Sequence, residues 1–130
     1  MKKIVKTSSA PLPVGPYNQA VVSNGMVFTA GQIPIDPSNN QLLDGPVEEQ
    51  ARLVLNNLKE VLEEAGSGMD YVLKVTVFLK DMNDFAAVNS VYAEFFKEET
   101  APARSAVEVA RLPKNVKVEM EAVATVSAGG

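Results

Sequence analysis

The sequence predicts a two-layer α/β (α+β) sandwich, in which a mixed sheet of about six strands carries two helices on one face. Two segments place apolar residues at helical spacing, and several shorter segments alternate apolar and polar residues as half-buried strands do. Turn and loop residues separate them into the order strand, hairpin, helix, strand, helix, strand, strand. We expect the chain to form a single domain, residues 1–130.

The first part of the chain predicts a short strand and a hairpin. Residues 4–5 are apolar, and residues 8–16 are rich in Pro and Gly, which is typical of a loop. Residues 20–30 are predicted to form the hairpin, because Asn24-Gly25 suits a type I′ turn, whose two central residues need positive φ.

A loop with three prolines, residues 34–46, leads into the first predicted helix. Pro46 is expected at the first helical position, and Gly66 is expected to end the helix. Glu48 and Arg52 are spaced for an ion pair across one turn. One face is apolar and is expected to pack on the sheet. Its residues are Val47, Ala51, Val54, Leu55, Leu58, Leu62 and Ala65.

Residues 71–80 predict the clearest strand, because apolar residues alternate along it. Its apolar face is expected to contain Leu73, Val75, Val77 and Leu79. Asn83 or Asp84 is expected to cap the second helix, which Ala101-Pro102 would end. The buried stripe of this helix is expected to contain Phe85, Val88, Tyr92, Phe95 and Phe96.

The last two predicted strands are residues 104–111 and 116–126. If these two strands pair, alternation places Arg104 and Glu119 together on the face away from the helices. Glu121 shares that face with Glu119. Because apolar residues also lie there, we expect an oligomer to cover this face of the sheet.

Composition excludes several kinds of chemistry, because the chain has no Cys and no His. Disulfides, a thiolate nucleophile, a His general base and Cys/His zinc sites are therefore impossible. No calcium-binding loop motif is present, so no metal site is expected. The net charge of −4 disfavours a nucleic acid partner. No secretory signal or membrane-spanning apolar run is recognisable, so we expect a soluble, cytoplasmic protein.

Several short blocks stand in a characteristic order along nearly the whole chain. They are Gly15-Pro16-Tyr17, Ala30-Gly31-Gln32-Ile33-Pro34, Val75-Thr76-Val77-Phe78-Leu79, Asp84-Phe85, Asn89, Val91-Tyr92, Pro102-Ala103-Arg104-Ser105-Ala106-Val107 and Ala110-Arg111-Leu112-Pro113. Together they resemble the Rid/YjgF family of enamine/imine deaminases. The resemblance implies a chorismate-mutase-like fold and a homotrimer with its sites at the subunit interfaces.

The same resemblance implies a function and a set of site residues. The substrates would be the enamines and imines that pyridoxal-phosphate dehydratases release, namely 2-aminoacrylate/2-iminopropanoate and 2-iminobutanoate, which are hydrolysed to 2-keto acids and ammonia. Arg104 would bind the substrate carboxylate, and Glu119 would orient or activate the attacking water. Further substrate-binding groups would be the side chains of Tyr17 and Asn89 and the backbone at Gly31 and Ala106.

Two positions depart from the family pattern. Many relatives have Ser where this chain has Ala30, and Cys where it has Ala106. A backbone N–H at position 106 does not depend on the side chain, so carboxylate binding is expected to survive. A role that requires a thiol at that position is impossible here.

The available residues suit this reaction. Arg presents a planar, permanently charged fork that matches a carboxylate in a bidentate way, which Lys does not. An imine is already electrophilic, so positioning and one general base are sufficient. We therefore expect no covalent nucleophile and no cofactor.

Each candidate residue also has an ordinary structural interpretation. Arg104 could form a surface ion pair, and Glu119 could belong to the polar face of its strand. Tyr17 could anchor its loop by packing on the core, and Asn89 could be an exposed helix residue. Gly31 could mark a bulge or a close approach of strands.

Two other functions compete with the deaminase. A ribonuclease or translation inhibitor is disfavoured by the acidic net charge and by the absence of His. A non-catalytic module could bind 2-keto acids without turnover, or bind unfolded chains through exposed apolar surface.

Overall fold

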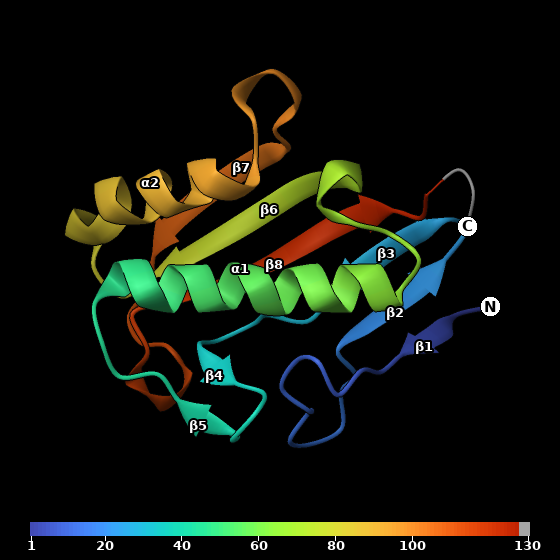
Figure 1. Ribbon diagram of the computed structural model, residues 1–130, viewed down its shortest axis with the longest axis horizontal. Helices are drawn as coiled ribbons and strands as arrows, with labels where there is room; N and C mark the ends of the chain where they lie inside the picture. The colour runs from blue at the N-terminus through green and yellow to red at the C-terminus, as the bar shows by residue number, and fades with distance from the viewer. Residues whose placement is uncertain (128–130) are drawn as a thin grey trace.

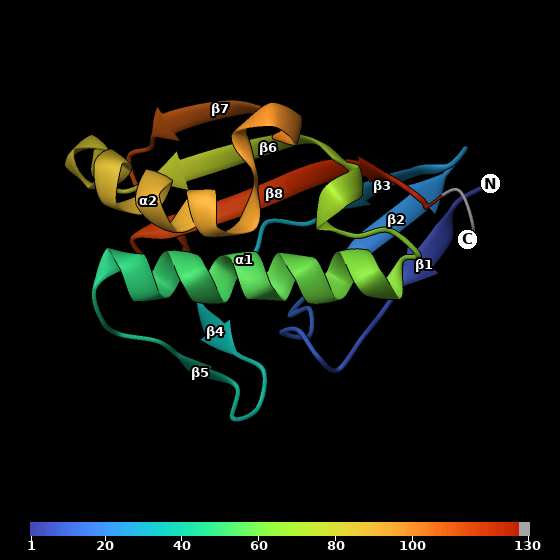
Figure 2. The same cartoon turned by 45° about the horizontal axis from the view of Figure 1, so that its top comes forward.

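The computed structural model describes residues 1–127 and forms two layers (Figure 1). Within these residues, a mixed six-stranded sheet has the strand order β1-β2-β3-β8-β6-β7. Two helices, α1 and α2, lie on the same face of the sheet, as Figures 1 and 2 show. The predicted two-layer architecture is therefore confirmed. The last three residues of the expected domain lie outside the described residues.

The first three strands form the expected meander. Its strands are β1 (Lys3–Val5), β2 (Ala20–Ser23) and β3 (Met26–Thr29), and both pairings are antiparallel. Asn24 and Gly25 connect β2 to β3 with φ values of 51° and 74°. These positive values confirm the turn predicted from Asn-Gly.

The proline-rich loop after β3 contains two short strands that periodicity did not reveal. β4 (Ile35–Asp36) and β5 (Gln41–Leu42) pair antiparallel as a separate two-stranded sheet. The carboxylate of Asp36 accepts hydrogen bonds from the backbone N–H and the hydroxyl of Ser38, at 2.9 and 2.7 Å. These hydrogen bonds of Asp36 stabilise the turn that folds the loop back on itself. Strands of two residues are too short to be predicted from the alternation of apolar and polar residues.

Helix α1 (Val47–Glu64) buries all of the predicted apolar stripe against the sheet. Pro46 is the N-cap residue with ψ of 150° and not the first helical residue, which corrects that detail. Gly66 follows the helix with φ of 82°, which is the left-handed conformation that Gly adopts readily at a helix end.

The predicted Glu48–Arg52 pair is wrong. Arg52 instead forms a bidentate pair with Glu94 on α2, with Nε–Oε1 and Nη2–Oε2 distances of 3.0 and 2.7 Å. The planar guanidinium of Arg52 matches both carboxylate oxygens of Glu94.

Strand β6 (Val72–Leu79) follows a short 3₁₀ turn, Met69–Tyr71, and begins with an irregularity. Its register against β8 shifts between Val72 and Lys74, so Leu73 is 47% exposed. The expectation that Leu73 belongs to the apolar face is therefore wrong, because the bulge reverses the alternation at that point.

Helix α2 (Phe85–Phe95) is shorter than predicted and differently capped. The Asp81 side chain accepts a hydrogen bond from the Asn83 backbone N–H and caps the preceding 3₁₀ turn, Met82–Asp84. Neither Asn83 nor Asp84 therefore caps α2 through its side chain. The helix ends where Phe96 becomes extended, before another 3₁₀ turn, Glu98–Thr100.

The buried stripe of α2 is partly as predicted. Val88, Tyr92 and Phe96 are buried, and Phe85 and Phe95 are only half-buried. Val91, which was not in the predicted stripe, is also buried.

The pairing of the last two strands differs from the expectation. β7 (Ala103–Glu108) pairs parallel with β6, and β8 (Val118–Thr125) pairs antiparallel with β6 and β3. Helix α2 carries the chain from the end of β6 back to its beginning, so β7 runs parallel to β6 at the edge of the sheet. Between β7 and β8 lies a 3₁₀ turn, Pro113–Asn115.

The face away from the helices carries an apolar row. Cross-strand pairing aligns Ile4 with Val21, Val21 with Phe28, and Phe28 with Val123. Ile4 and Phe28 are 45% and 46% exposed, so this row is open to solvent in one chain. Within residues 1–127, no helix has the length and apolar character that a membrane crossing requires.

Candidate functional site

Arg104 lies on the helix-covered face of β7 and contacts α2. It pairs in register with Val75, whose side chain is fully buried beneath the helices. The Asn89 Oδ1 accepts a hydrogen bond from the Arg104 Nη1 at 2.8 Å. The Arg104 Cζ lies 4.7 Å from the Tyr92 ring centroid and 5.3 Å from that of Phe85.

These contacts form one side of a hollow of about 490 Å³. Among the described residues, no carboxylate forms an ion pair with Arg104. Asn89 is neutral, so the guanidinium keeps an uncompensated positive charge and several unused donors. The residues that line the hollow are Asn89, Tyr92, Ala93, Phe96, Lys97, Glu98, Ala101, Pro102 and Arg104.

Ala106 lies beside this arrangement, with its methyl group packed against the core. The Val109 N–H donates to the Leu79 carbonyl of β6 at 2.9 Å. Successive N–H groups along a strand point to opposite edges, so the Ala106 N–H points away from β6. Because β7 is an edge strand, this donor faces the open edge of the sheet.

A second, smaller hollow lies around Tyr17 and Gly31 and has a volume of about 220 Å³. Gly15, with φ of 119°, turns the chain before Tyr17 in a conformation that other residues rarely adopt. The Tyr17 side chain is 51% exposed, and its hydroxyl accepts a hydrogen bond from the Val14 N–H at 3.3 Å. Lys114, at φ of 54°, lines the same hollow.

The loop that carries Tyr17 is held by a buried amide. Gln19 is 1% exposed, and its Oε1 accepts from the Thr7 N–H at 2.7 Å. Its Nε2 donates to the carbonyls of Thr7, Ala10 and Pro11 at 3.0, 3.3 and 2.8 Å. A single side chain thereby satisfies several main-chain groups that strand pairing leaves open.

Glu119 lies against Gly31. Gln32 and Met120 exchange backbone hydrogen bonds of 2.8 and 3.2 Å, which join this segment to β8. A Cβ on Gly31 would overlap the Glu119 carboxylate and lie 2.9 Å from its Cδ. Partial burial, and to a smaller extent the nearby Glu121, raise the pKa of Glu119.

The expected site residues therefore form two groups on opposite faces. Glu119 pairs in register with Phe78 on the face away from the helices, whereas Arg104 faces α2. The expectation that Arg104 and Glu119 share one face of one chain is wrong, because β6 separates β7 from β8 and Arg104 faces the helices. We call these groups the Arg104 half-site (Asn89, Arg104 and Ala106) and the Glu119 half-site (Tyr17, Gly31 and Glu119).

Comparison with known proteins agrees with both the fold and the residue blocks. A family model described as endoribonuclease L-PSP, which represents Rid/YjgF proteins, matches residues 7–126. The chain belongs to the Rid/YjgF family.

Relatives of this Rid/YjgF chain are close and match along nearly their full length. A RutC family protein of Synechocystis is 62% identical over 123 residues, which are 94% of this chain and 95% of the relative. A 2-iminobutanoate/2-iminopropanoate deaminase of Salmonella typhimurium is 51% identical over 126 residues, covering 95% and 98%. The crystal structure of Escherichia coli TdcF with bound serine superposes with a TM-score of 0.89 at 49% identity, covering 96% and 99%.

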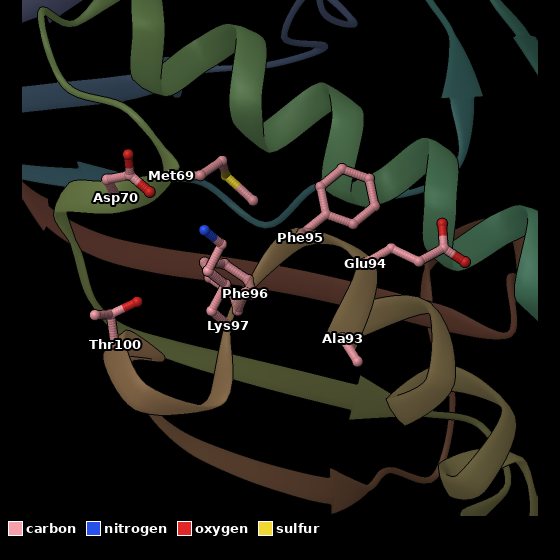
Figure 3. A pocket seen from close by; sticks show the side chains of 8 residues that line it. All are labelled: Met69, Asp70, Ala93, Glu94, Phe95, Phe96, Lys97 and Thr100. Carbon is pink, nitrogen blue, oxygen red and sulfur yellow. The ribbon is translucent and has the colours of Figure 1, made fainter.

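A third hollow of about 400 Å³ contains none of the expected site residues of this Rid/YjgF chain. Figure 3 shows Asp70, Lys97 and Thr100 among the side chains that line it. Glu94 also lines it, but its carboxylate already pairs with Arg52. Phe96 and Lys97 border both this hollow and the one at Arg104.

The sequence interpretation missed the aromatic contacts of Arg104 in this Rid/YjgF chain. Phe85 and Tyr92 were predicted only as core residues, yet their rings flank the guanidinium. The signal was present in the spacing, because Phe85, Asn89 and Tyr92 fall at positions i, i+4 and i+7 of one helix. Lys114 was also not predicted to border the hollow at Tyr17.

Proposed function

We propose that the protein hydrolyses small, reactive enamines and imines of 2-keto acids, namely 2-aminoacrylate/2-iminopropanoate and 2-iminobutanoate. The observation that carries the proposal is the Arg104 guanidinium, which is held by neutral and aromatic groups and has no ion-pair partner among the described residues. A relative named 2-iminobutanoate/2-iminopropanoate deaminase and one named as a reactive intermediate deaminase support this substrate class.

In this proposal, Arg104 binds the substrate carboxylate. One Nη already donates to Asn89, which leaves the other guanidinium N–H groups for two carboxylate oxygens. A charge-assisted hydrogen bond of this kind contributes about 1.5–3 kcal/mol. The Ala106 N–H at the open edge of β7 is a further donor within the Arg104 half-site.

Glu119 then acts as the general base. An enamine first tautomerises to its imine, which reacts as the N-protonated iminium. The Glu119 carboxylate accepts a proton from water as the oxygen attacks the iminium carbon, and the C=N electron pair moves to nitrogen to give a neutral aminoalcohol. Glu119 returns that proton to the amino group, the C–N bond breaks as the hydroxyl oxygen forms the C=O bond, and the hydroxyl proton passes to the Glu119 carboxylate as ammonia and the 2-keto acid leave. Because partial burial raises its pKa, the carboxylate is a stronger base than an exposed one. A general base contributes about 10²–10⁴-fold to the rate.

The imine carbon is electrophilic without further activation. The reaction therefore requires that the substrate and the attacking water are held in a reactive orientation, and that one group accepts a proton. It calls for no covalent intermediate, so the proposal needs no nucleophilic side chain, metal or cofactor.

We propose further that each active site combines the Arg104 half-site of one subunit with the Glu119 half-site of another. Opposite faces of one sheet cannot converge on a single small substrate, whereas two copies of the chain can bring them together. A homotrimer closed by one repeated, head-to-tail interface satisfies this requirement and gives identical sites. The exposed row of Ile4, Val21, Phe28 and Val123 supplies apolar surface for burial in such an assembly.

The main test is a coupled assay in which a threonine or serine dehydratase generates the short-lived intermediate. We expect the wild type to accelerate release of the 2-keto acid, and Arg104→Ala and Glu119→Gln each to lose that acceleration while remaining folded. A wild type that leaves the release rate unchanged but binds 2-oxobutanoate would instead favour a non-catalytic binding module.

Mixing the two inactive variants tests the shared site. After subunit exchange at equal amounts, about a quarter of head-to-tail sites combine an intact Arg104 with an intact Glu119. We expect about that fraction of wild-type activity to return. No recovery after verified exchange would place both residues in one subunit's site, against the proposal.

A ribonuclease is the second candidate, because the matching family model is described as an endoribonuclease. The test is RNA binding over a range of salt concentrations together with RNA cleavage. Steep salt dependence and cleavage that survives Arg104→Ala would favour this activity.

A further inference from the structure

Two aromatic rings of one helix, α2, lie beside the Arg104 guanidinium. Its Cζ lies 4.7 Å from the Tyr92 ring centroid and 5.3 Å from the Phe85 ring centroid. These distances fall within the range in which a cation is attracted to the face of an aromatic ring. Asn89, which lies between the two rings along α2, accepts the hydrogen bond from Nη1.

The hydroxyl of Tyr92 does not explain why a tyrosine lies here. Tyr92 is 6% exposed, and its hydroxyl has no hydrogen-bond partner among the described residues. Burial raises the pKa of Tyr92 to about 12, although the nearby Arg104 charge opposes this shift. The phenol is therefore neutral near pH 7, and the part of Tyr92 that contacts Arg104 is its ring.

Ring contact and carboxylate binding use different parts of a guanidinium. Aromatic rings pack against its planar face, whereas a carboxylate binds the N–H groups along its edge. Among the described residues, the Arg104 guanidinium makes a single hydrogen bond, to Asn89, so its other N–H groups remain available to a carboxylate. The hydrogen bond to Asn89 fixes rotation within that plane, because it engages one end of the fork.

We propose that Tyr92 and Phe85 are positioning residues, whose rings hold the guanidinium plane of Arg104 in the orientation that accepts a substrate carboxylate. This inference rests on the proposed function and adds a determinant of substrate affinity that acts through Arg104. The Tyr92 ring is the stronger contributor, because it is nearer and more deeply buried. Its hydroxyl contributes nothing to the positioning.

The test compares Tyr92→Phe, which keeps the ring, with Tyr92→Leu, which removes it at similar hydrophobicity. We expect Tyr92→Phe to keep the wild-type KM within about twofold, and Tyr92→Leu to raise KM about tenfold with kcat within about threefold. The Kd for 2-oxobutanoate, measured by calorimetry, should follow KM. A Tyr92→Phe variant as impaired as Tyr92→Leu would overturn the assignment of the effect to the ring.

A second readout does not depend on activity. The Nε–Hε resonance of Arg104 is identified by its absence in Arg104→Lys, and ring currents should shift it in the wild type and in Tyr92→Phe. We expect Tyr92→Leu to move and broaden this resonance. If Tyr92→Leu does not fold, Phe85→Leu at the half-buried position is used in its place. We expect it to change KM and the Arg104 resonance in the same direction as Tyr92→Leu, but less.

The two proposals fail in different ways. A wild type with a shifted Arg104 resonance but no deaminase activity would refute the proposed function and leave the ring contact standing. An active wild type whose KM and Arg104 resonance are unchanged in folded Tyr92→Leu and Phe85→Leu would refute the positioning role alone.

Discussion

Gly31→Ala is expected to separate catalysis from folding, because the new methyl group displaces the Glu119 carboxylate. The added Cβ would lie 2.9 Å from the Glu119 Cδ and 3.2 Å from its Cγ, and would overlap Oε2. Ordinary contacts between such atoms begin near 3.4 Å. The carboxylate must therefore move by about 1 Å, and a misplacement of that size can lower a rate about 100-fold.

The cost in stability should be small by comparison. Gly31 does not have the positive φ that would strain an alanine, and the obstructing atoms belong to the end of a flexible side chain. Holding the Glu119 side chain about 30° away from a preferred rotamer costs about 0.5–1.5 kcal/mol. We therefore expect kcat/KM in the dehydratase-coupled assay to fall about 100-fold, while urea unfolding changes by no more than this amount.

Gly68→Ala is the matched control, since a Cβ there would meet only Tyr71 Cδ2 at 3.8 Å. It should keep wild-type activity. Because Gly31→Ala acts through the carboxylate, it should have no further effect in a Glu119→Ala background. A folded Gly31→Ala variant with the wild-type kcat/KM, or additive effects of the two substitutions, would refute a displacement of the Glu119 carboxylate.

Three further predictions concern single side chains. Gln19→Leu should lower the free energy of unfolding by about 2–4 kcal/mol in urea titration, because it leaves several buried main-chain groups unpaired; an unchanged midpoint would contradict this. The pKa of Glu119 is raised, so activity should fall as the pH decreases through that pKa, because the base becomes protonated. The free energy of unfolding, relative to that of Glu119→Gln, should fall as the pH rises through the same pKa. Identical pH profiles of the wild type and Glu119→Gln would disprove both effects. Glu94→Gln should cause a small loss of stability that disappears at high salt, because the pair with Arg52 is exposed; a loss that persists in salt would point to packing.

Periodicity predicted the elements better than their neighbours in space. The helical stripe of α1 and the Asn24-Gly25 turn are local patterns, and both are confirmed. The pairing of β7 depends on how α2 returns the chain, which no local pattern specifies. The exposed Leu73 also follows from an irregular register with a partner strand distant in sequence.

The candidate site follows the same division. The family resemblance pointed to Arg104, Asn89 and Glu119, and the contact between the first two confirms that they lie together. Their separation from Glu119 could not be predicted, because it depends on which face of an edge strand meets the helices. The aromatic flank of Arg104 was predictable in principle from spacing, but burial alone accounts equally well for apolar residues at those positions.

The place of β8 in the sheet has a consequence for how the protein folds during synthesis. Among the described residues, β8 is the strand that joins β1–β3 to β6–β7, yet it is the last strand in the sequence. A nascent chain that has left the ribosome only as far as β7 holds two sheet fragments with no strand between them. The edges of these two fragments stay unpaired until residues 118–125 are synthesised. We therefore expect cooperative folding only after synthesis of β8, and we expect chains that stall before it to aggregate readily.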